Sequence, residues 1–245
     1  MPMWSSRLKS HFRANRHARR IRNTTRIFLD SFFVSGNYIK LIVKKHPIDL
    51  VLDVGANVGQ FGIDLRNAGF TSKIVSFEPS LEAFCQLREN VKFFQPWDII
   101  NVALGQKDSK AELNLAENDG LSNSFLSMNE LHNSIYPGSD FIATEIVQLL
   151  RLDSFDFPEK SILLKLDVQG FELEVLKGSL GILPKISYVL LEISLVSLYT
   201  GQPTLLELLT FLDLHGYEVT EFFNFQRSRG RLIQFDLLVS RKSSD

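Results

Sequence analysis

The chain has 245 residues, 44% of them hydrophobic, which is enough to bury the core of one sizeable α/β domain and too apolar for a disordered chain. The formal net charge of −1 conceals an asymmetry, because residues 1–29 hold eight of the 27 Lys and Arg residues and no acidic residue. The rest of the chain carries 19 basic and 28 acidic residues, a charge of −9. An acidic body without an aromatic stacking platform argues against DNA or RNA as a partner.

The expected location follows from two features. The single cysteine, Cys85, excludes an intrachain disulfide, and no run of about 20 apolar residues exists because Asp30 and Lys40 interrupt the most hydrophobic N-terminal segment. We therefore expect a cytoplasmic protein. Within residues 1–29, apolar residues recur at roughly helical spacing among basic ones, which suits peripheral contact with an anionic membrane. A solvated basic tail is the alternative interpretation.

In the first half of the chain, apolar runs alternate with amphipathic stretches, and the segment from Ile27 to Val43 predicts one or two helices covering an edge or end of a sheet. The elements expected after it are a strand at 49–54, a helix ending at Gly69, a strand at 73–77, a helix from the cap Ser80 to Asn90, and a strand at 98–104. Strands and helices alternating at this pitch predict right-handed crossovers and a parallel sheet.

The periodicity weakens in the middle of the chain. After a short strand expected at 111–115, a long polar stretch runs to residue 144, and we interpret it as a loop over a substrate site. The elements expected beyond it are strands at 162–168 and 186–193, helices at 171–177 and 203–215, and a pair of strands at 217–223 and 232–240. The last two are close enough in sequence to pair as an antiparallel hairpin.

A glycine-bearing turn follows the first expected strand. Gly55 permits a tight turn, Asn57 tolerates unusual backbone angles, and Gly59 lets the next helix approach the strand and a ligand closely. A dinucleotide fingerprint would have glycine at positions 57 and 60, where this chain has Asn57 and Gln60. The turn therefore predicts a small-ligand site and disfavours a nicotinamide-dependent oxidoreductase.

Two carboxylates near this turn indicate the kind of ligand. Asp53, at the end of the first strand, would suit a cationic ligand or one with an ammonium group. Glu78 ends the second strand and can accept the hydrogens of both hydroxyls of a ribose, as an adenosine-bearing ligand requires. An exposed strand terminus is the alternative for Glu78, but its strand–turn–helix–strand context favours the adenosine ligand.

A third group of polar residues follows the strand expected at 162–168. Lys165 and Asp167 lie two residues apart and so project to one face, and a buried lysine there needs a carboxylate partner. Asp167 would face the same crevice as Asp53, but an ion pair with Lys165 or a helix cap would also explain it. Glu172, at the start of the next helix, is explained equally well by the helix dipole.

Several segments together carry a family resemblance: DVGANVGQFG, SFEPS, NVALG, LLKLDVQGFELEVLKG, LLEISLVSLYTGQP and LIQFDLLVSRK. In this order, from about Asp49 to Lys242, they resemble the FkbM family of S-adenosylmethionine-dependent methyltransferases. The resemblance implies a Rossmann-like, seven-stranded, mostly parallel α/β sheet with helices on both faces and a reversed last strand, the class I methyltransferase fold. The family usually has glutamate where this chain has Gln169, which excludes an essential acid at that position.

The resemblance also implies site residues for S-adenosylmethionine. They are Asp53 and Gly55 near its amino-acid portion, Ala56, Asn57 and Gly59 along the turn, Glu78 on the ribose, and Ala103 beside the adenine. An alcohol acceptor needs a base to take its proton, and Asp167 is the first candidate and His132 the second. Asp167 and Glu192 could supply oxygen ligands for Mg²⁺, but without a defined spacing we predict no metal.

The predicted organisation is a basic helical extension at residues 1–45 and a methyltransferase domain at residues 46–245. The implied activity is methyl transfer to a hydroxyl of a sugar, polyketide or lipid-linked glycan, with an envelope glycolipid as one concrete acceptor. A glycan on a lipid carrier would also suit a basic arm near an anionic bilayer. A noncatalytic domain that only binds a ligand or docks through its arm is the remaining alternative.

Overall fold

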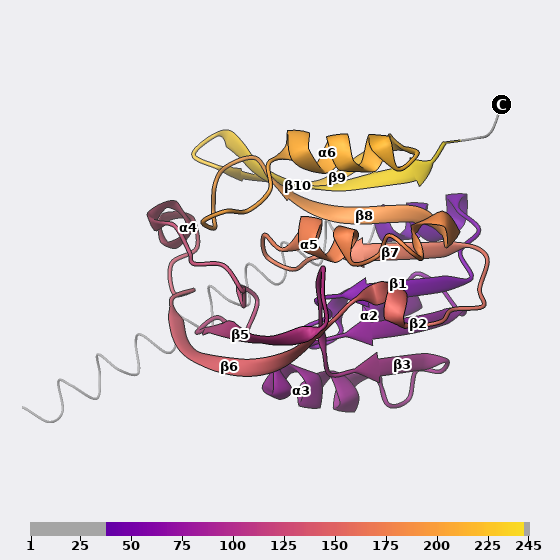
Figure 1. Cartoon of the computed structure of the whole chain (residues 1–245), viewed down its shortest axis with the longest axis horizontal. Coiled ribbons are helices and arrows are strands. Elements are labelled where there is room, and N and C mark those ends of the chain that lie inside the picture. The colour runs from indigo at the N-terminus through magenta and orange to yellow at the C-terminus, as the bar shows by residue number, and fades with distance from the viewer. Residues whose placement is uncertain (1–37, 243–245) are drawn as a thin grey trace, which may run out of the picture.

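The computed structural model describes residues 38–242, which form a seven-stranded sheet with a three-stranded sheet beside it (Figure 1). The strand order in the large sheet is β3-β2-β1-β7-β8-β10-β9. Its strands are β1 (Leu50–Val54), β2 (Lys73–Phe77), β3 (Trp97–Ile100), β7 (Ile162–Leu166), β8 (Ile186–Ser194), β9 (Tyr217–Ser228) and β10 (Arg231–Arg241). The small sheet has the order β4-β6-β5 and consists of β4 (Ala103–Leu104), β5 (Ser109–Ala116) and β6 (Phe141–Leu150).

The five strands from β3 to β8 run parallel, and β10 is antiparallel to both β8 and β9. This is the mostly parallel sheet with an antiparallel C-terminal hairpin that the sequence predicts. The hairpin strands extend beyond the expected 217–223 and 232–240. Their greater length carries β9 and β10 past the end of β8 toward the polar loops.

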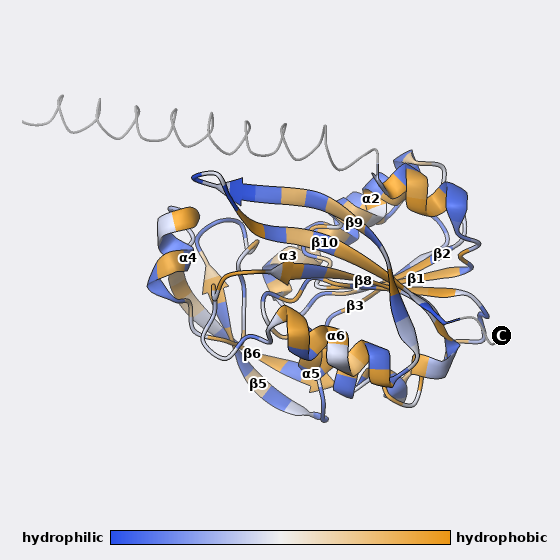
Figure 2. Ribbon diagram, turned by 90° about the horizontal axis from the view of Figure 1, so that it is seen from above, coloured by the Kyte–Doolittle hydropathy of each residue, from blue (hydrophilic) through white to orange (hydrophobic). Residues whose placement is uncertain are grey.

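Side chains of each central strand alternate between two hydrophobic cores, as the two-residue period of a strand requires. In β1, Leu50, Leu52 and Val54 belong to one core, and Val51 belongs to the other. Both faces of the strands are therefore apolar, as a parallel sheet covered on both sides demands. Figure 2 shows the resulting concentration of hydrophobic residues along the central strands.

Helices cover both faces of the large sheet. They are α2 (Gln60–Asn67), α3 (Leu81–Val91), α5 (Glu172–Lys177) and α6 (Leu205–Leu214), and single 3₁₀ turns lie at Leu152–Ser154 and Leu183–Lys185. Helix α4 (Glu130–Ile135) lies apart from these faces (Figure 1), and its Ile135 packs in a separate cluster with Leu198 and Tyr199. Helices α2 and α3 contribute to the core that contains Val51, and α5 and α6 contribute to the core of Leu50 and Leu52. Helix α6 begins at a capping box in which Thr204 and Glu207 satisfy each other's backbone N–H groups.

Two expectations about the middle of the chain are wrong. The strand predicted at 98–104 is divided, because Asn101 turns back to donate to the carbonyls of Glu78 and Pro79, and Ala103 and Leu104 then join the small sheet. The polar stretch expected to be loop up to residue 144 ends earlier, at the start of β6. That strand leaves most side chains from 141 to 146 exposed, so its apolar alternation is weak until Val147 and Leu149 enter a core.

The described part of the N-terminal region packs on the large sheet. Residues 38–45 are helical, and Ile39 and Ile42 are buried in the same core as α2 and α3. This agrees with the predicted helical cover over residues 27–43, whose first part lies outside the described residues. Residues 1–29, for which membrane contact is predicted, also lie outside them. Between residues 38 and 242, no helix is both long and apolar enough to cross a membrane.

Candidate functional site

A cavity of about 1710 Å³ lies at the carboxyl ends of the parallel strands. Its wall combines the turns after β1, β2 and β7, the ends of β8, β9 and β10, and the polar segments 117–125 and 135–139. The crevice at the carboxyl edge of an open α/β sheet is where such folds bind ligands. Because a pocket for one small molecule measures roughly 300 to 1,000 Å³, this cavity has room for two ligands.

The turn after β1 is shaped by backbone conformation. Gly55 has φ +75°, and a Cβ on it would lie 2.0 Å from the carbonyl oxygen of Asp167. Asn57 also has a positive φ, +48°, and its side chain accepts a hydrogen bond from the Val58 N–H. Gly59 has φ +95° and packs against Leu87 of α3. Glycine at 55 is therefore required twice, by its backbone angle and by the close approach of β7.

Glu78 connects the ends of β1 and β2. Its Oε2 accepts from the Asn57 N–H at 2.8 Å, and its Oε1 accepts from the Ser80 N–H at 2.9 Å. Burial raises the pKa of this carboxyl from its ordinary value to about 7, against the lowering effect of the two backbone donors. Each oxygen keeps a lone pair for a further donor, so the group can accept from two adjacent ligand hydroxyls. Ser80 begins α3 without a side-chain cap bond, contrary to the expected capping role.

A buried ion pair joins β1 to β7. Lys165 Nζ lies 3.1 Å from Asp53 Oδ1 and 3.7 Å from Asp167 Oδ2, and it donates to the Gly55 carbonyl at 3.2 Å. The buried lysine thus has the carboxylate partners that the sequence predicts. These partners keep its pKa above the ordinary value although burial acts in the opposite direction. Asp53 is fully buried against Lys165 and does not line the cavity, whereas Asp167 does.

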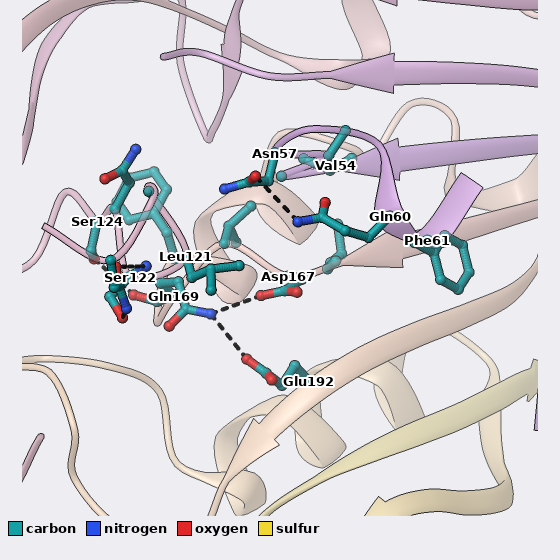
Figure 3. A pocket seen from close by; sticks show the side chains of 18 of the residues that line it. Val54, Asn57, Gln60, Phe61, Leu121, Ser122, Ser124, Asp167, Gln169 and Glu192 are labelled. Carbon is teal, nitrogen blue, oxygen red and sulfur yellow. Dashed lines mark hydrogen bonds between the residues drawn. The ribbon is translucent and has the colours of Figure 1, made fainter. Parts of the chain in front are cut away.

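Gln169 forms a bridge between two carboxylates (Figure 3). Its Nε2 donates to Asp167 Oδ1 at 2.8 Å and to Glu192 Oε2 at 3.1 Å. Its backbone has φ +52°, and its Oε1 accepts from the Tyr199 hydroxyl at 2.8 Å. A neutral amide suits this place because it supplies both hydrogens to two acceptors, which a glutamate could not do. Burial and the nearby Asp167 raise the pKa of Glu192 well above its ordinary value.

His132, the second candidate base, is buried in α4. Its Nδ1 lies 3.1 Å from the Ser139 hydroxyl and its Nε2 lies 3.1 Å from the Tyr199 hydroxyl. Burial lowers the pKa of the imidazole. Both ring nitrogens therefore contact neighbouring protein groups, and His132 connects the segment before β6 to the network of Tyr199 and Gln169.

Polar side chains of β9 and β10 form the wall beyond β8. The Tyr136 hydroxyl lies 2.8 Å from Gln234 Oε1 and 3.1 Å from Gln226 Oε1. Asn224 Nδ2 lies 3.4 Å from Asp236 Oδ2. Burial raises the pKa of Asp236 to about 7, against a lowering hydrogen bond from Tyr38. We call Tyr38, Tyr136, Asn224, Gln226, Gln234 and Asp236 the distal wall.

The cavity gathers most of the residues expected at a site. Those that line it are Gly55, Ala56, Asn57, Glu78, Ala103, His132 and Asp167, whereas Asp53 and Gly59 support the turn from behind. No role is predicted from the sequence for the distal wall or for Tyr199. Their residues come from five separated segments, and the strand alternation of 217–240 was the one signal that could have pointed to some of them. Among residues 38–242, no cluster of three His, Cys, Asp or Glu side chains is arranged to hold a metal ion.

Comparison with known proteins agrees with this geometry. Among solved structures, a magnesium protoporphyrin IX methyltransferase from Synechocystis with bound S-adenosylmethionine superposes with a TM-score of 0.51 at 12% identity, covering 91% of this chain and 82% of that one. The similarity defines the class I methyltransferase fold. The model of the methyltransferase FkbM domain matches residues 53–219. The chain belongs to this family and is an S-adenosylmethionine-dependent methyltransferase.

Two curated relatives have named activities. The 2-O-methyltransferase NoeI of Sinorhizobium fredii is 28% identical over 193 residues, which cover 75% of this chain and 77% of that protein. The hexuronic acid methyltransferase AglP of Haloferax volcanii is 29% identical over 156 residues, covering 63% of this chain and 60% of that protein. The aligned part is thus less than two thirds of the second relative's length.

The turn and its surroundings fit S-adenosylmethionine. The Glu78 carboxylate, with one lone pair left on each oxygen, can accept from the two ribose hydroxyls. Ala103, which lines the cavity one strand further along, leaves space for a flat ring system. Asp167 lines the cavity next to the turn and beside Lys165, and a carboxylate in this position favours a ligand with positive charge.

Proposed function

We propose that the protein transfers a methyl group to a hydroxyl of a sugar. The names of the two relatives, a 2-O-methyltransferase and a hexuronic acid methyltransferase, support this class of acceptor. The observation that carries the proposal is the composition of the cavity beyond Asp167. The distal wall presents amides, a carboxylate and phenols, groups that pair with the many hydroxyls of a sugar. A polyketide, the alternative acceptor, would be better matched by an apolar wall.

The order of the strands supports a candidate base between the two halves of the cavity. Gly55 and Glu78 follow β1 and β2, Asp167 follows β7, and Asp236 lies on β10. Three strand spacings of about 4.8 Å separate β1 from β10, roughly 14 Å, so two ligands can bind side by side. A group after the central strand β7 is then near the boundary between them.

The bound cofactor would supply a methyl group on a positively charged sulfur. The protein's part is to align the acceptor oxygen with that group and to receive the hydroxyl proton. We assign the proton-accepting role to Asp167. Its Oδ1 is held by Gln169 and its Oδ2 faces Lys165, which fixes the orientation of the carboxylate. The hydrogen bonds of both nitrogens of His132 favour a supporting role for that residue.

More specifically, we propose that the acceptor is a sugar of a glycan or envelope glycolipid. We also propose that the protein is cytoplasmic and peripheral to the membrane. The basic composition of residues 1–29 supports a membrane role. Liposome flotation with the full chain and with a variant lacking residues 1–29 tests it. Equal flotation of the two proteins on anionic vesicles would contradict a membrane role for this segment.

Transfer assays distinguish the sugar proposal from its alternatives. We expect purified protein to bind S-adenosylhomocysteine and not NAD in calorimetric titration. With S-adenosylmethionine, it should methylate hydroxyls in a panel of methyl glycosides, with the product identified by NMR. Methylation of a polyketide alcohol in preference to every glycoside would overturn the sugar assignment. Binding of S-adenosylhomocysteine without transfer to any acceptor would favour the noncatalytic interpretation.

A further inference from the structure

The distal wall lies at the end of the cavity away from the turn. The turn and Glu78, which fit the cofactor, follow β1 and β2, whereas Asn224 and Gln226 lie on β9 and Gln234 and Asp236 lie on β10. Function on a common fold resides in the particular side chains of the site. The distal wall is therefore where the choice of acceptor is to be sought.

The two glutamines of this wall offer donors to a ligand. Gln234 is 5% exposed, and the Oε1 atoms of Gln226 and Gln234 both contact the Tyr136 hydroxyl. No group among the described residues accepts a hydrogen bond from the Nε2 of either side chain. Both residues line the cavity, so their amide hydrogens remain for oxygen atoms of a bound molecule.

The charge of the cavity restricts the kind of ligand oxygen atoms that the two glutamines can bind. Among described residues, the lining includes the acidic side chains of Glu78, Asp119, Asp167, Glu192 and Asp236, and one lysine or arginine, Lys165. The Lys165 ammonium is already paired with Asp53 and Asp167. An anionic group on an acceptor would therefore meet an excess of carboxylates and no unpaired cation within residues 38–242.

Two of these carboxylates are adjacent at the distal wall. Glu192 of β8 and Asp236 of β10 are direct partners in the antiparallel register, so their side chains project to the same face of the sheet. That face also carries Lys165 and the helical segment 38–45, from which Tyr38 stacks on Phe223 at 5.0 Å. A sugar held by Gln226 and Gln234 would lie beside this pair.

We propose that the distal wall selects an uncharged sugar as the acceptor, with Gln226 and Gln234 binding its hydroxyls and Glu192 and Asp236 rejecting a sugar that carries a carboxylate. This inference rests on the proposed sugar methyltransferase function and narrows its substrate class. It distinguishes this chain from its relative AglP, whose name assigns it a hexuronic acid. Like charges placed close together in a partly buried site disfavour binding strongly.

Three matched acceptors test the proposal on the full-length protein: methyl glucoside, methyl glucuronide and methyl glucuronamide. The glucuronamide has nearly the shape of the glucuronide and no charge. We expect kcat/KM for the glucuronide to be at least about tenfold below the values for the other two, the scale of one charge interaction. A glucuronamide as poor as the glucuronide would show exclusion by size and would overturn the proposal.

Variants of Glu192 and Asp236 test whether these two residues cause the discrimination against the glucuronide. At pH 8.5, above the pKa of about 7 of Asp236, Asp236→Asn should raise the ratio of glucuronide to glucoside kcat/KM about tenfold, since it removes one charge at nearly constant shape. Glu192→Gln should raise the ratio by a smaller factor, because burial and the nearby Asp167 raise the pKa of Glu192 well above its ordinary value. Asp213→Asn is the matched control, because Asp213 lies on α6 in an exposed ion pair with Lys242, and this variant should leave the ratio unchanged. Thermal melts identify a variant that fails to fold, in which case the other variant decides.

The possible failures are separable. Wild-type preference for the glucuronide would overturn the charge selection while leaving the sugar methyltransferase function in place. Unchanged ratios in both folded variants would overturn the roles of Glu192 and Asp236. Absence of transfer to all three sugars, with S-adenosylhomocysteine bound normally, would instead count against the proposed function itself.

Discussion

The two ends of the cavity are built in different ways. The end that fits the cofactor comes mostly from one continuous stretch, from Gly55 to Glu78, with Ala103 beyond it, and its shape depends on positive φ angles and backbone donors. The distal wall brings together side chains from position 38, position 136 and the hairpin of β9 and β10. The first end can tolerate little change in its backbone, while the second can change its ligand through single side chains. Substitutions at each end should therefore have different consequences.

The largest effect is expected at the boundary between the two ends. Asp167→Asn keeps the shape of the side chain and an oxygen that can accept from Gln169, but removes the capacity to take a proton. We expect kcat to fall by about 10² to 10⁴, the range for loss of a general base. The affinity for S-adenosylhomocysteine should change only slightly. Single-turnover methyl transfer and calorimetric titration measure the two quantities.

Asp156→Asn is the control for this substitution, because Asp156 is exposed at the surface, where it pairs with Lys185. A wild-type kcat in folded Asp167→Asn would exclude Asp167 as the base. Asp167 would then no longer mark the boundary between the cofactor end and the distal wall, and Glu192 would become the next candidate for the base.

The rigidity of the cofactor end is tested by Gly55→Ala. The new Cβ would lie 2.0 Å from the Asp167 carbonyl, at a residue with φ +75°. Strain at a positive φ costs about 1 to 3 kcal/mol, and displacement of β7 adds to it. Gly138→Ala is a matched control, since Gly138 has φ +87° and nothing within 4 Å of its Cβ position. Urea unfolding should show a clearly greater loss of unfolding free energy for Gly55→Ala, and equal losses would refute the close-approach argument.

The role of Glu78 predicts a dependence on pH. Burial raises its pKa to about 7 in the free protein, and the ionised form is the better acceptor for ribose hydroxyls. At pH 8 we expect wild type to bind S-adenosylhomocysteine about tenfold more tightly than Glu78→Gln, as for a hydrogen bond to a charged group. The difference should shrink at pH 5.5, where Glu78 is protonated. Titrations that show a constant difference across this range would contradict the assignment.

The same group affects stability with a defined sign. A carboxyl whose pKa is higher in the folded than in the unfolded state binds its proton more tightly when folded. It therefore stabilises the free protein most below pH 4.5, and the stability is lost as pH rises toward 7. Replacement by glutamine should flatten this part of the profile of unfolding free energy against pH. The cofactor end thus combines a cost in stability with a gain in ligand binding.

The residues proposed for the cofactor end stay a prediction, and the sequence singles them out because their signals are local. The apolar run of β1, the glycine at 55 and the carboxylate at 78 after a strand can each be recognised from a few neighbouring residues. The large sheet was predicted for the same reason. The division of the strand at Asn101 was not, because it depends on contacts with Glu78 and Pro79, and β6 was missed because its exposed first half lacks a buried alternation.

The distal wall could not be predicted in this way. Nothing adjacent to Gln226 or Gln234 in the sequence indicates that both will meet Tyr136, some 90 residues earlier. In the sequence, Asp236 is an ordinary strand residue, and only the pairing of β10 with β8 brings Glu192 beside it. Similarly, the burial of His132 follows from Tyr199, which approaches from a loop far along the chain. Long-range pairing of polar side chains leaves no local periodicity to detect.

The smallest predicted effect concerns the phenol that holds the two glutamines. Tyr136→Phe keeps the ring packed against His132 but removes the hydroxyl that contacts Gln226 and Gln234. Loss of one neutral hydrogen bond costs about 0.5 to 1.5 kcal/mol, so KM for a glycoside acceptor should rise about two- to tenfold while the affinity for S-adenosylhomocysteine stays constant. A change in cofactor affinity instead would mean that the two ends are coupled through His132 and Tyr199. Because Tyr136 lies outside the turn but touches that network, it is the residue at which the independence of the two ends can be measured most directly.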